Sequence, residues 1–148
     1  MENLTSRWRP VPRLRALSLA VVWRGPLMLL SAVTDDAGRR IGWRPLGGGI
    51  EFGETSAEAV AREMREETGA VFRPTRRLGL IENLFEHHGE RGHELIVVWE
   101  GVLDEPGLAA SGSFVIEDGP YRDHGAWLDP SALPEGQPLL PDGLAGLL

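Results

Sequence analysis

The sequence predicts a single α+β domain in which β-strands carry two or three helices packed on their faces. Three observations support this. The chain has 148 residues, about the size of one domain, and its 42% hydrophobic and 25% charged residues are ordinary globular values. Short aliphatic and β-branched runs alternate with polar or glycine-containing turns, as in strands. Residues 56–68 instead place apolar side chains at helical spacing.

The first half of the chain begins with an irregular arm, residues 1–13, in which Pro10 and Pro12 disfavour regular structure. The domain itself is expected over residues 14–148. Its first expected strands are residues 14–23 and 27–33 joined by a tight turn, followed by a polar turn at 34–40 and an extended segment at 41–46.

The helix at residues 56–68 has start and stop signals at both ends. Thr55 or Ser56 can cap its amino terminus, Glu58 lies in its first turn, and Gly69 follows at the usual stop position. Its apolar side, expected to pack on a sheet, consists of Ala57, Val60, Ala61, Met64 and Thr68.

The second half of the chain predicts a strand pair and three shorter elements. The expected elements are long strands at 76–88 and 93–103 around a polar turn at 89–92, two short strands within 111–129, and a brief C-terminal helix that Pro141 would begin.

Composition excludes several classes of protein. The chain has no cysteine, which rules out disulfides, thiolate metal sites and cysteine nucleophiles. No apolar run is long enough to span a bilayer, so no membrane association and a cytoplasmic location are expected. A net charge of −7 argues against binding a nucleic-acid polymer. Arg7, Arg9, Arg13 and Arg15 form a local exception, which is either a solvated basic arm or a contact site.

Three carboxylates share one side of the expected helix. Glu63, Glu66 and Glu67 stand at positions i, i+3 and i+4, where like charges repel. They occupy an arc expected to face mostly away from the sheet, and the glycines at 47–49 allow backbone carbonyls to approach it. Such an oxygen-rich arrangement suits a hard divalent cation, Mg²⁺ or Mn²⁺, whose charge would reverse the repulsion.

These residues belong to a longer pattern: Gly48, Glu54 after five residues, and Arg62 to Ala70 after seven more. The pattern resembles the Nudix box, and the chain resembles a Nudix hydrolase over roughly residues 14–130. The resemblance implies a mixed β-sheet sandwiched between helices, an α/β/α arrangement. It also implies metal-dependent hydrolysis of a nucleoside diphosphate linked to another group, by water attack at phosphorus.

The resemblance also implies roles for individual residues. Glu63 and Glu67 would be the principal metal ligands, with Glu66 as a third ligand or the base. The carbonyl of Gly48, or of Gly47, would be a further ligand. Glu54 would support the ligands or polarise the attacking water, and Arg62 would bond Glu54 and brace the loop against the helix.

Several assignments stay open. The base in this family is sometimes an acidic residue outside the box. Glu117, Asp118 and Asp123 are candidates, although the first interpretation of each is a solvated loop charge. The sequence also departs from the family pattern, since Pro45-Leu46 precedes Gly47 where proline often stands directly before the glycines. Ala70 is smaller than the usual closing residue.

The expected partner is a small nucleoside diphosphate derivative of unspecified leaving group, and assembly as a homodimer is left open. The alternative function is a non-catalytic nucleotide sensor on the same fold. His87, His88 and His93 are expected to be exposed turn residues. Trp23, Trp43, Trp99 and Trp127, with Phe85, are expected to be mostly core, with one of them available to stack on a base.

Overall fold

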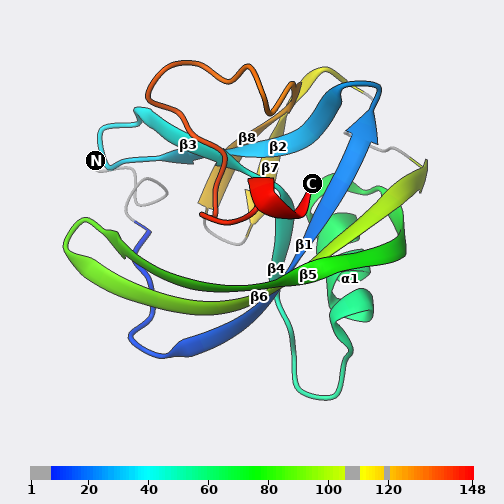
Figure 1. Ribbon diagram of the computed structural model, residues 1–148, viewed down its shortest axis with the longest axis horizontal. Helices are drawn as coiled ribbons and strands as arrows, with labels where there is room; N and C mark the ends of the chain where they lie inside the picture. The colour runs from blue at the N-terminus through cyan, green and yellow to red at the C-terminus, as the bar shows by residue number, and fades with distance from the viewer. Residues whose placement is uncertain (1–7, 106–110, 119–120) are drawn as a thin grey trace.

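The structure is a computed structural model that describes residues 8–105, 111–118 and 121–148. Its strands are β1 (Leu14–Arg24), β2 (Leu27–Thr34), β3 (Arg40–Arg44), β4 (Leu46–Gly49), β5 (Val71–His87), β6 (Glu90–Glu105), β7 (Ser113–Asp118) and β8 (Tyr121–Leu128). One α-helix, α1 (Ser56–Thr68), and a 3₁₀ turn, η3 (Ala145–Leu147), accompany them (Figure 1).

The strands form a mixed sheet in the order β5-β6-β1-β2-β8-β7, with β4 beside β1 and β3 beside β2. β1 and β6 are parallel, whereas the other pairs among the named strands are antiparallel. The predicted mixed sheet within an α+β domain is therefore confirmed.

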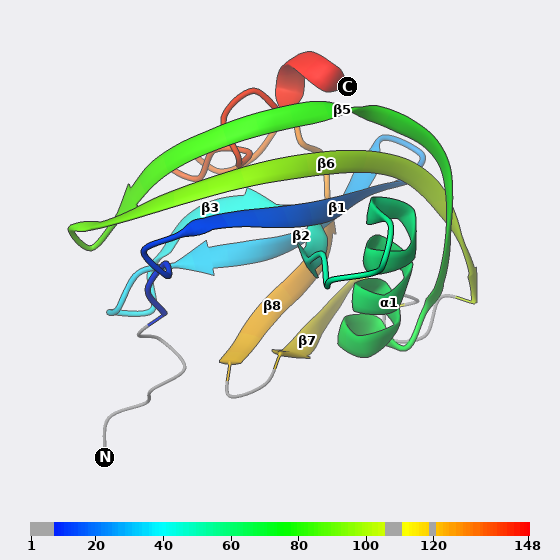
Figure 2. The same cartoon turned by 90° about the horizontal axis from the view of Figure 1, so that it is seen from below.

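β1 and β2 pair only beside their connecting turn, where Trp23 and Arg24 oppose Met28 and Leu27. Beyond that point they separate, and β4 and β3 add to their respective edges. Figure 2 shows the result: β5, β6 and β1 arch over one side, while β2, β3, β8 and β7 lie on the other. The separation leaves room for the cavity described below.

Both faces of β1 are buried, because its side chains alternate between two hydrophobic clusters. Leu17, Leu19 and Val21 pack in a cluster that also contains Leu144 and Ile96. The intervening residues pack in a second cluster against α1, through contacts that include Ala20, Val22, Val60 and Met64. This two-sided burial explains why the segment reads as a continuous apolar run.

The expected C-terminal helix is wrong in position and type. Within the described residues the segment carries only the 3₁₀ turn η3, and α1 is the one α-helix. The reason is that residues 138–140 are held extended beside β3: the Trp43 amide donates to Pro138, and the Leu140 amide donates to Trp43. Pro141 follows an extended segment and does not begin a helix.

The long hairpin also differs from its prediction. β5 begins at Val71, and register shifts on either side of Thr75 accommodate Pro74 within the strand. The turn consists of His88 and Gly89, both at positive φ, as a two-residue hairpin turn requires. Glu90 to Gly92 were expected in the turn but pair with β5.

Candidate active site

The helix α1 begins and ends as the sequence predicts. The amide of Glu58 donates to the Thr55 hydroxyl at 3.1 Å, and Gly69 closes the helix in a left-handed conformation. The start of the helix is tied to the sheet, since Ser18 Oγ donates to the Ser56 carbonyl at 2.7 Å and Trp99 Nε1 donates to the Ser56 hydroxyl at 2.9 Å. These bonds fix the helix relative to β1 and β6.

Two glycines of β4 bring the backbone against β1 on one side and the helix on the other. Gly47 has φ 151°, and a β-carbon there would overlap the Ser18 carbonyl oxygen. A β-carbon at Gly48 would lie 2.5 Å from the carboxyl carbon of Glu63. Only glycine therefore allows the Gly48 backbone to lie directly against the Glu63 carboxylate.

Arg62 connects the loop before α1 to the helix. Its Nη2 donates to Glu54 Oε1 at 2.6 Å and to the Gly49 carbonyl at 3.0 Å, and its Nε donates to Glu54 Oε2 at 3.1 Å. Its Nη1 donates to Glu63 Oε1 at 3.0 Å and lies 3.3 Å from Glu66 Oε2. The fork of the guanidinium thus holds the loop and two helix carboxylates in one network.

The hydrogen bonds of this network shift the pKa values of Glu54 and Arg62. The pKa of Glu54 is lowered, first by the hydrogen bonds from Arg62 and then by the amide of Glu51, which donates to Glu54 Oε1 at 2.9 Å. The pKa of Arg62 is raised, mainly by its hydrogen bonds to Glu54. Both groups are therefore charged at neutral pH.

The three helix carboxylates do not share one environment. The side chain of Glu66 is 59% exposed, that of Glu63 is 14% exposed, and Glu67 is only 8% exposed. The expectation that all three face mostly away from the sheet is wrong for Glu67. The buried stripe of the helix includes Ala59, Val60, Met64 and Thr68, and Glu67 stands at the edge of this stripe, facing β4.

The donor set suits a hard cation. Glu63 and Glu67 supply carboxylate oxygens one helical turn apart, and the Gly48 backbone lies against Glu63. Among the residues that the structure describes, no three acidic or histidine side chains already converge around one point. Glu66 is drawn toward Arg62 at 3.3–3.4 Å and is well exposed.

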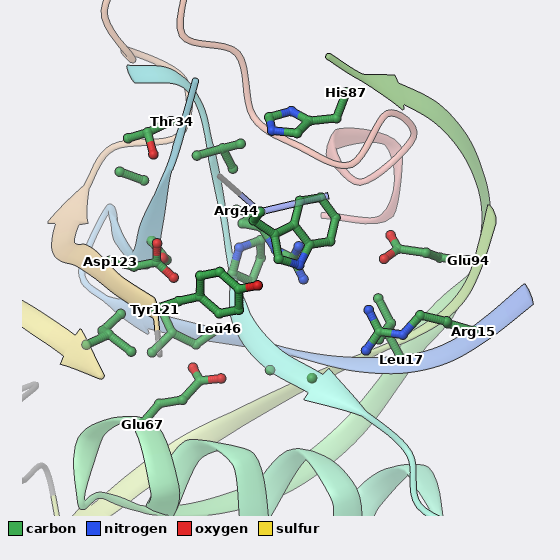
Figure 3. A pocket seen from close by; sticks show the side chains of 18 of the residues that line it. Arg15, Leu17, Thr34, Arg44, Leu46, Glu67, His87, Glu94, Tyr121 and Asp123 are labelled. Atoms are coloured by element: carbon green, nitrogen blue, oxygen red, sulfur yellow. The ribbon is translucent and has the colours of Figure 1, made fainter. Parts of the chain in front are cut away.

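A cavity of about 540 Å³ opens beside these groups, between the separated halves of the sheet. This volume is typical of small-molecule sites. Figure 3 shows Glu67 at one end of the cavity and His87 at the other, with Arg15 and Glu94 on one side and Tyr121 and Asp123 on the other. Gly47 and Gly48 also line it.

The structure thus brings together Gly48, Glu54, Arg62, Glu63 and Glu67. Of the acidic candidates outside the box, Asp123 lines the cavity. Glu117 belongs to β7, but its side chain, like that of Asp118, lies outside the described part of the chain.

Sequence reasoning missed several residues that line the cavity. They are Trp8, Arg44, Glu94 and Tyr121. Trp8 was assigned to the irregular arm and was left out of the tryptophans considered for stacking. The early arginines were the available signal, since Arg9, Arg13 and Arg15 also line the cavity.

Some of the histidines and tryptophans line the cavity and others belong to the hydrophobic core. The expectation of exposed turn histidines is wrong for His87, which is half-buried, lines the cavity and has its pKa lowered mainly by burial. Trp43 and Trp127 are core residues, 3% and 7% exposed, whereas Trp23 is partly exposed.

A family model described as the NUDIX domain matches residues 15–143. The chain belongs to the Nudix family of hydrolases, which act on pyrophosphate bonds.

Solved structures share the fold at low sequence identity. A MutT NUDIX hydrolase from Burkholderia pseudomallei is 21% identical, with a TM-score of 0.65 over 91% of this chain and 96% of that one. An ADP-ribose pyrophosphatase from Streptococcus suis 89-1591 is 16% identical, with a TM-score of 0.56 over 84% and 78%. A UDP-X diphosphatase is also 16% identical, with a TM-score of 0.56 over 88% and 58%.

Proposed function

We propose that the chain is a divalent-metal-dependent pyrophosphohydrolase that cleaves a nucleoside diphosphate linked to another group. Glu67 carries the proposal: it is a nearly buried carboxylate at the wall of a cavity, beside the glycine backbone that touches Glu63. A carboxylate at the wall of a cavity is suited to hold a hard divalent cation. A cation bound there, together with a diphosphate in the cavity, would supply complementary charge.

Glu63, Glu67 and the Gly48 carbonyl would hold Mg²⁺ or Mn²⁺, with Glu66 as a further ligand after it leaves Arg62. A divalent ion held there would supply positive charge that neutralises the oxygens of a diphosphate and so favours attack by water at phosphorus. The weak, exposed contact of Glu66 with Arg62 makes its release inexpensive.

Arg62 and Glu54 position the site. By holding the Gly49 carbonyl and both oxygens of Glu54, Arg62 fixes the loop on which the Gly48 carbonyl lies. Glu54 stays ionised and polarises the attacking water or supports the ligands. Glu66, or an acid on β7 or β8 such as Glu117, would accept the proton of that water.

The substrate class rests on the family and the cavity. Two of the similar structures are an ADP-ribose pyrophosphatase and a UDP-X diphosphatase, whose names refer to nucleoside diphosphates joined to another group. The names of these two proteins differ in the attached group, and both proteins are 16% identical to this chain. The proposal therefore commits to the nucleoside diphosphate part.

A panel of nucleoside triphosphates, nucleotide sugars, dinucleoside polyphosphates and simple phosphomonoesters, with the products separated by ion-exchange chromatography, tests the proposal. We expect hydrolysis of at least one member with Mg²⁺ or Mn²⁺ and none with EDTA. Hydrolysis that persists unchanged in EDTA, or confined to simple phosphomonoesters, would contradict it.

A further inference from the structure

One end of the cavity is aromatic. Trp8, at the start of the described chain, stacks on Phe85 with ring centroids 6.4 Å apart and planes 12° apart, and lies 5.6 Å from the ring of His87. Phe85 in turn covers Gly92 of the neighbouring strand. We call Trp8, Phe85 and His87 the aromatic wall. It is built from two segments that are far apart in sequence, the arm before β1 and the strand β5.

The N-terminal arm is fastened in place. Arg9 donates to both carboxylate oxygens of Asp36, at 2.9 and 2.6 Å, and to the Trp8 carbonyl at 2.9 Å. The amide of Asp36 donates to His88 Nε2 at 3.1 Å. Asp36 lies in the turn between β2 and β3, so the arm, this turn and the hairpin tip meet at one place. The bidentate bond fixes the residue directly after Trp8.

Two arginines lie along the cavity between its ends. Arg15 and Arg44 are half-buried, and neither makes a side-chain hydrogen bond or ion pair with any residue that the structure describes. Figure 3 shows Arg44 on the His87 side and Arg15 beside β1, across from Tyr121. Half-buried guanidinium groups without a protein partner are suited to an anionic ligand.

The order of chemistry along the cavity is therefore carboxylates and glycine backbone, then cationic side chains, then aromatic rings. A nucleoside diphosphate is likewise anionic at one end, where a cation held by the carboxylates and the arginines suit the diphosphate, and aromatic at the other end, where the rings suit the base. We propose that Trp8 is the surface on which the base of the substrate stacks, and that Arg9 and Asp36 are positioning residues that hold it there. This inference rests on the proposed function, because it orients the substrate with its diphosphate at Glu67.

The neighbouring groups are consistent with a neutral, planar ligand at the wall. Burial, helped by His88 and Arg9, lowers the pKa of His87, so that this ring is uncharged at neutral pH. Glu94, 5% exposed and bonded by Asn83 at 3.1 Å, adds an acceptor to the cavity. Stacking supplies affinity for any base, and such acceptors supply preference among bases.

Calorimetric titration with Mg²⁺ present tests the proposal without requiring turnover, because free nucleoside diphosphates lack the attached group of the proposed substrate and serve here only as ligands. The ligands are ADP, GDP, CDP and UDP, with inorganic pyrophosphate as the probe that lacks a base. We expect Trp8→Ala to weaken the tightest nucleotide roughly 5- to 150-fold, the cost of losing one base–aromatic stack, with pyrophosphate affinity unchanged. Trp8→Phe should lose less than Trp8→Ala, and Arg9→Ala should fall between wild type and Trp8→Ala.

Trp23→Ala is the matched control, since Trp23 is partly exposed on β1 and does not line the cavity. It should leave all affinities unchanged. Equal weakening of nucleotide and pyrophosphate by Trp8→Ala, unchanged nucleotide affinity in Trp8→Ala and Trp8→Phe, or no nucleotide binding to the wild type would each overturn the inference. Base-dependent binding without hydrolysis of any panel member would overturn the proposed function and leave the inference standing.

Discussion

At the scale of single residues, Arg62 and Glu67 have different surroundings. Arg62 has its charge matched by several acidic groups and by a carbonyl within the protein. Glu67 is almost completely buried at the wall of a cavity. We therefore expect Arg62 to act mainly through structure and Glu67 mainly through chemistry.

Replacing Arg62 by alanine should lower both Tm and turnover. The substitution removes the bonds that join Glu54 and the Gly49 carbonyl to the helix, and we expect Tm to fall by about 3–8 °C near neutral pH. Arg65→Ala is the control, since Arg65 is an exposed arginine on the same helix. Thermal melts followed by circular dichroism give both values. An equal small effect of the two substitutions would contradict the bracing role.

The effect of Arg62→Ala should also depend on pH. Because Arg62 lowers the pKa of folded Glu54, the stabilisation is present above the unfolded pKa of a glutamate and is lost as pH falls through the lower folded value. The difference in Tm between wild type and Arg62→Ala should therefore narrow as pH is lowered from 7 toward 3. A gap that stays constant or widens over this range would contradict the assignment.

Glu67→Gln should separate chemistry from folding. Loss of a ligand that stabilises charge in the transition state should reduce kcat by at least about 10²- to 10³-fold, while Tm changes little because glutamine keeps the size of the side chain. Glu82→Gln, the same change at an exposed position of β5, should leave both quantities unchanged. Near-normal kcat in Glu67→Gln on a confirmed substrate would show that Glu67 is not a ligand.

At the scale of elements, the site depends on how closely β4 approaches both β1 and α1. Gly47 faces backbone, which cannot move aside, whereas Gly48 faces the end of the Glu63 side chain, which can. The two neighbouring glycines should therefore respond differently to the same added methyl group.

We expect Gly47→Ala to lower Tm strongly, because its β-carbon overlaps the Ser18 carbonyl oxygen and its φ is unfavourable for alanine. Gly48→Ala should fold with a small loss of Tm but displace the Glu63 carboxylate, reducing kcat by about 10²-fold. Gly146→Ala, with open space around it, is the control. Full activity in Gly48→Ala would contradict the placement of Glu63 in the site.

Local elements were predicted well where a local signal decides them. The caps at Thr55 and Gly69 define α1, and both bounds of the helix were predicted. The C-terminal segment was not, because its conformation depends on backbone bonds between Trp43 and residues almost a hundred positions away. The inward position of Glu67 was missed for a related reason: the helix packs against β4, which lies outside the helical pattern itself.

At the scale of the whole molecule, the separation of β1 from β2 creates the cavity, and distant parts of the chain complete it. Motif spacing identified Gly48, Glu54 and the helix acids, since these are fixed relative to one another by one loop and one helix. Other parts of the cavity lining, with Trp8, Arg44 and Tyr121, come from three separate segments. No spacing rule relates them, so they became visible only when the fold brought them together.

We propose that water attacks a phosphorus atom of a diphosphate. Hydrolysis in ¹⁸O-enriched water tests this directly, because the label marks the atom that water attacked. A substrate found in the panel is hydrolysed with Mg²⁺ in labelled water, and the products are analysed by mass spectrometry. Attack at phosphorus should leave one labelled oxygen on a phosphate group of one product, with the bonds of the nucleoside intact. Label on a sugar carbon, with both phosphates unlabelled, would contradict it.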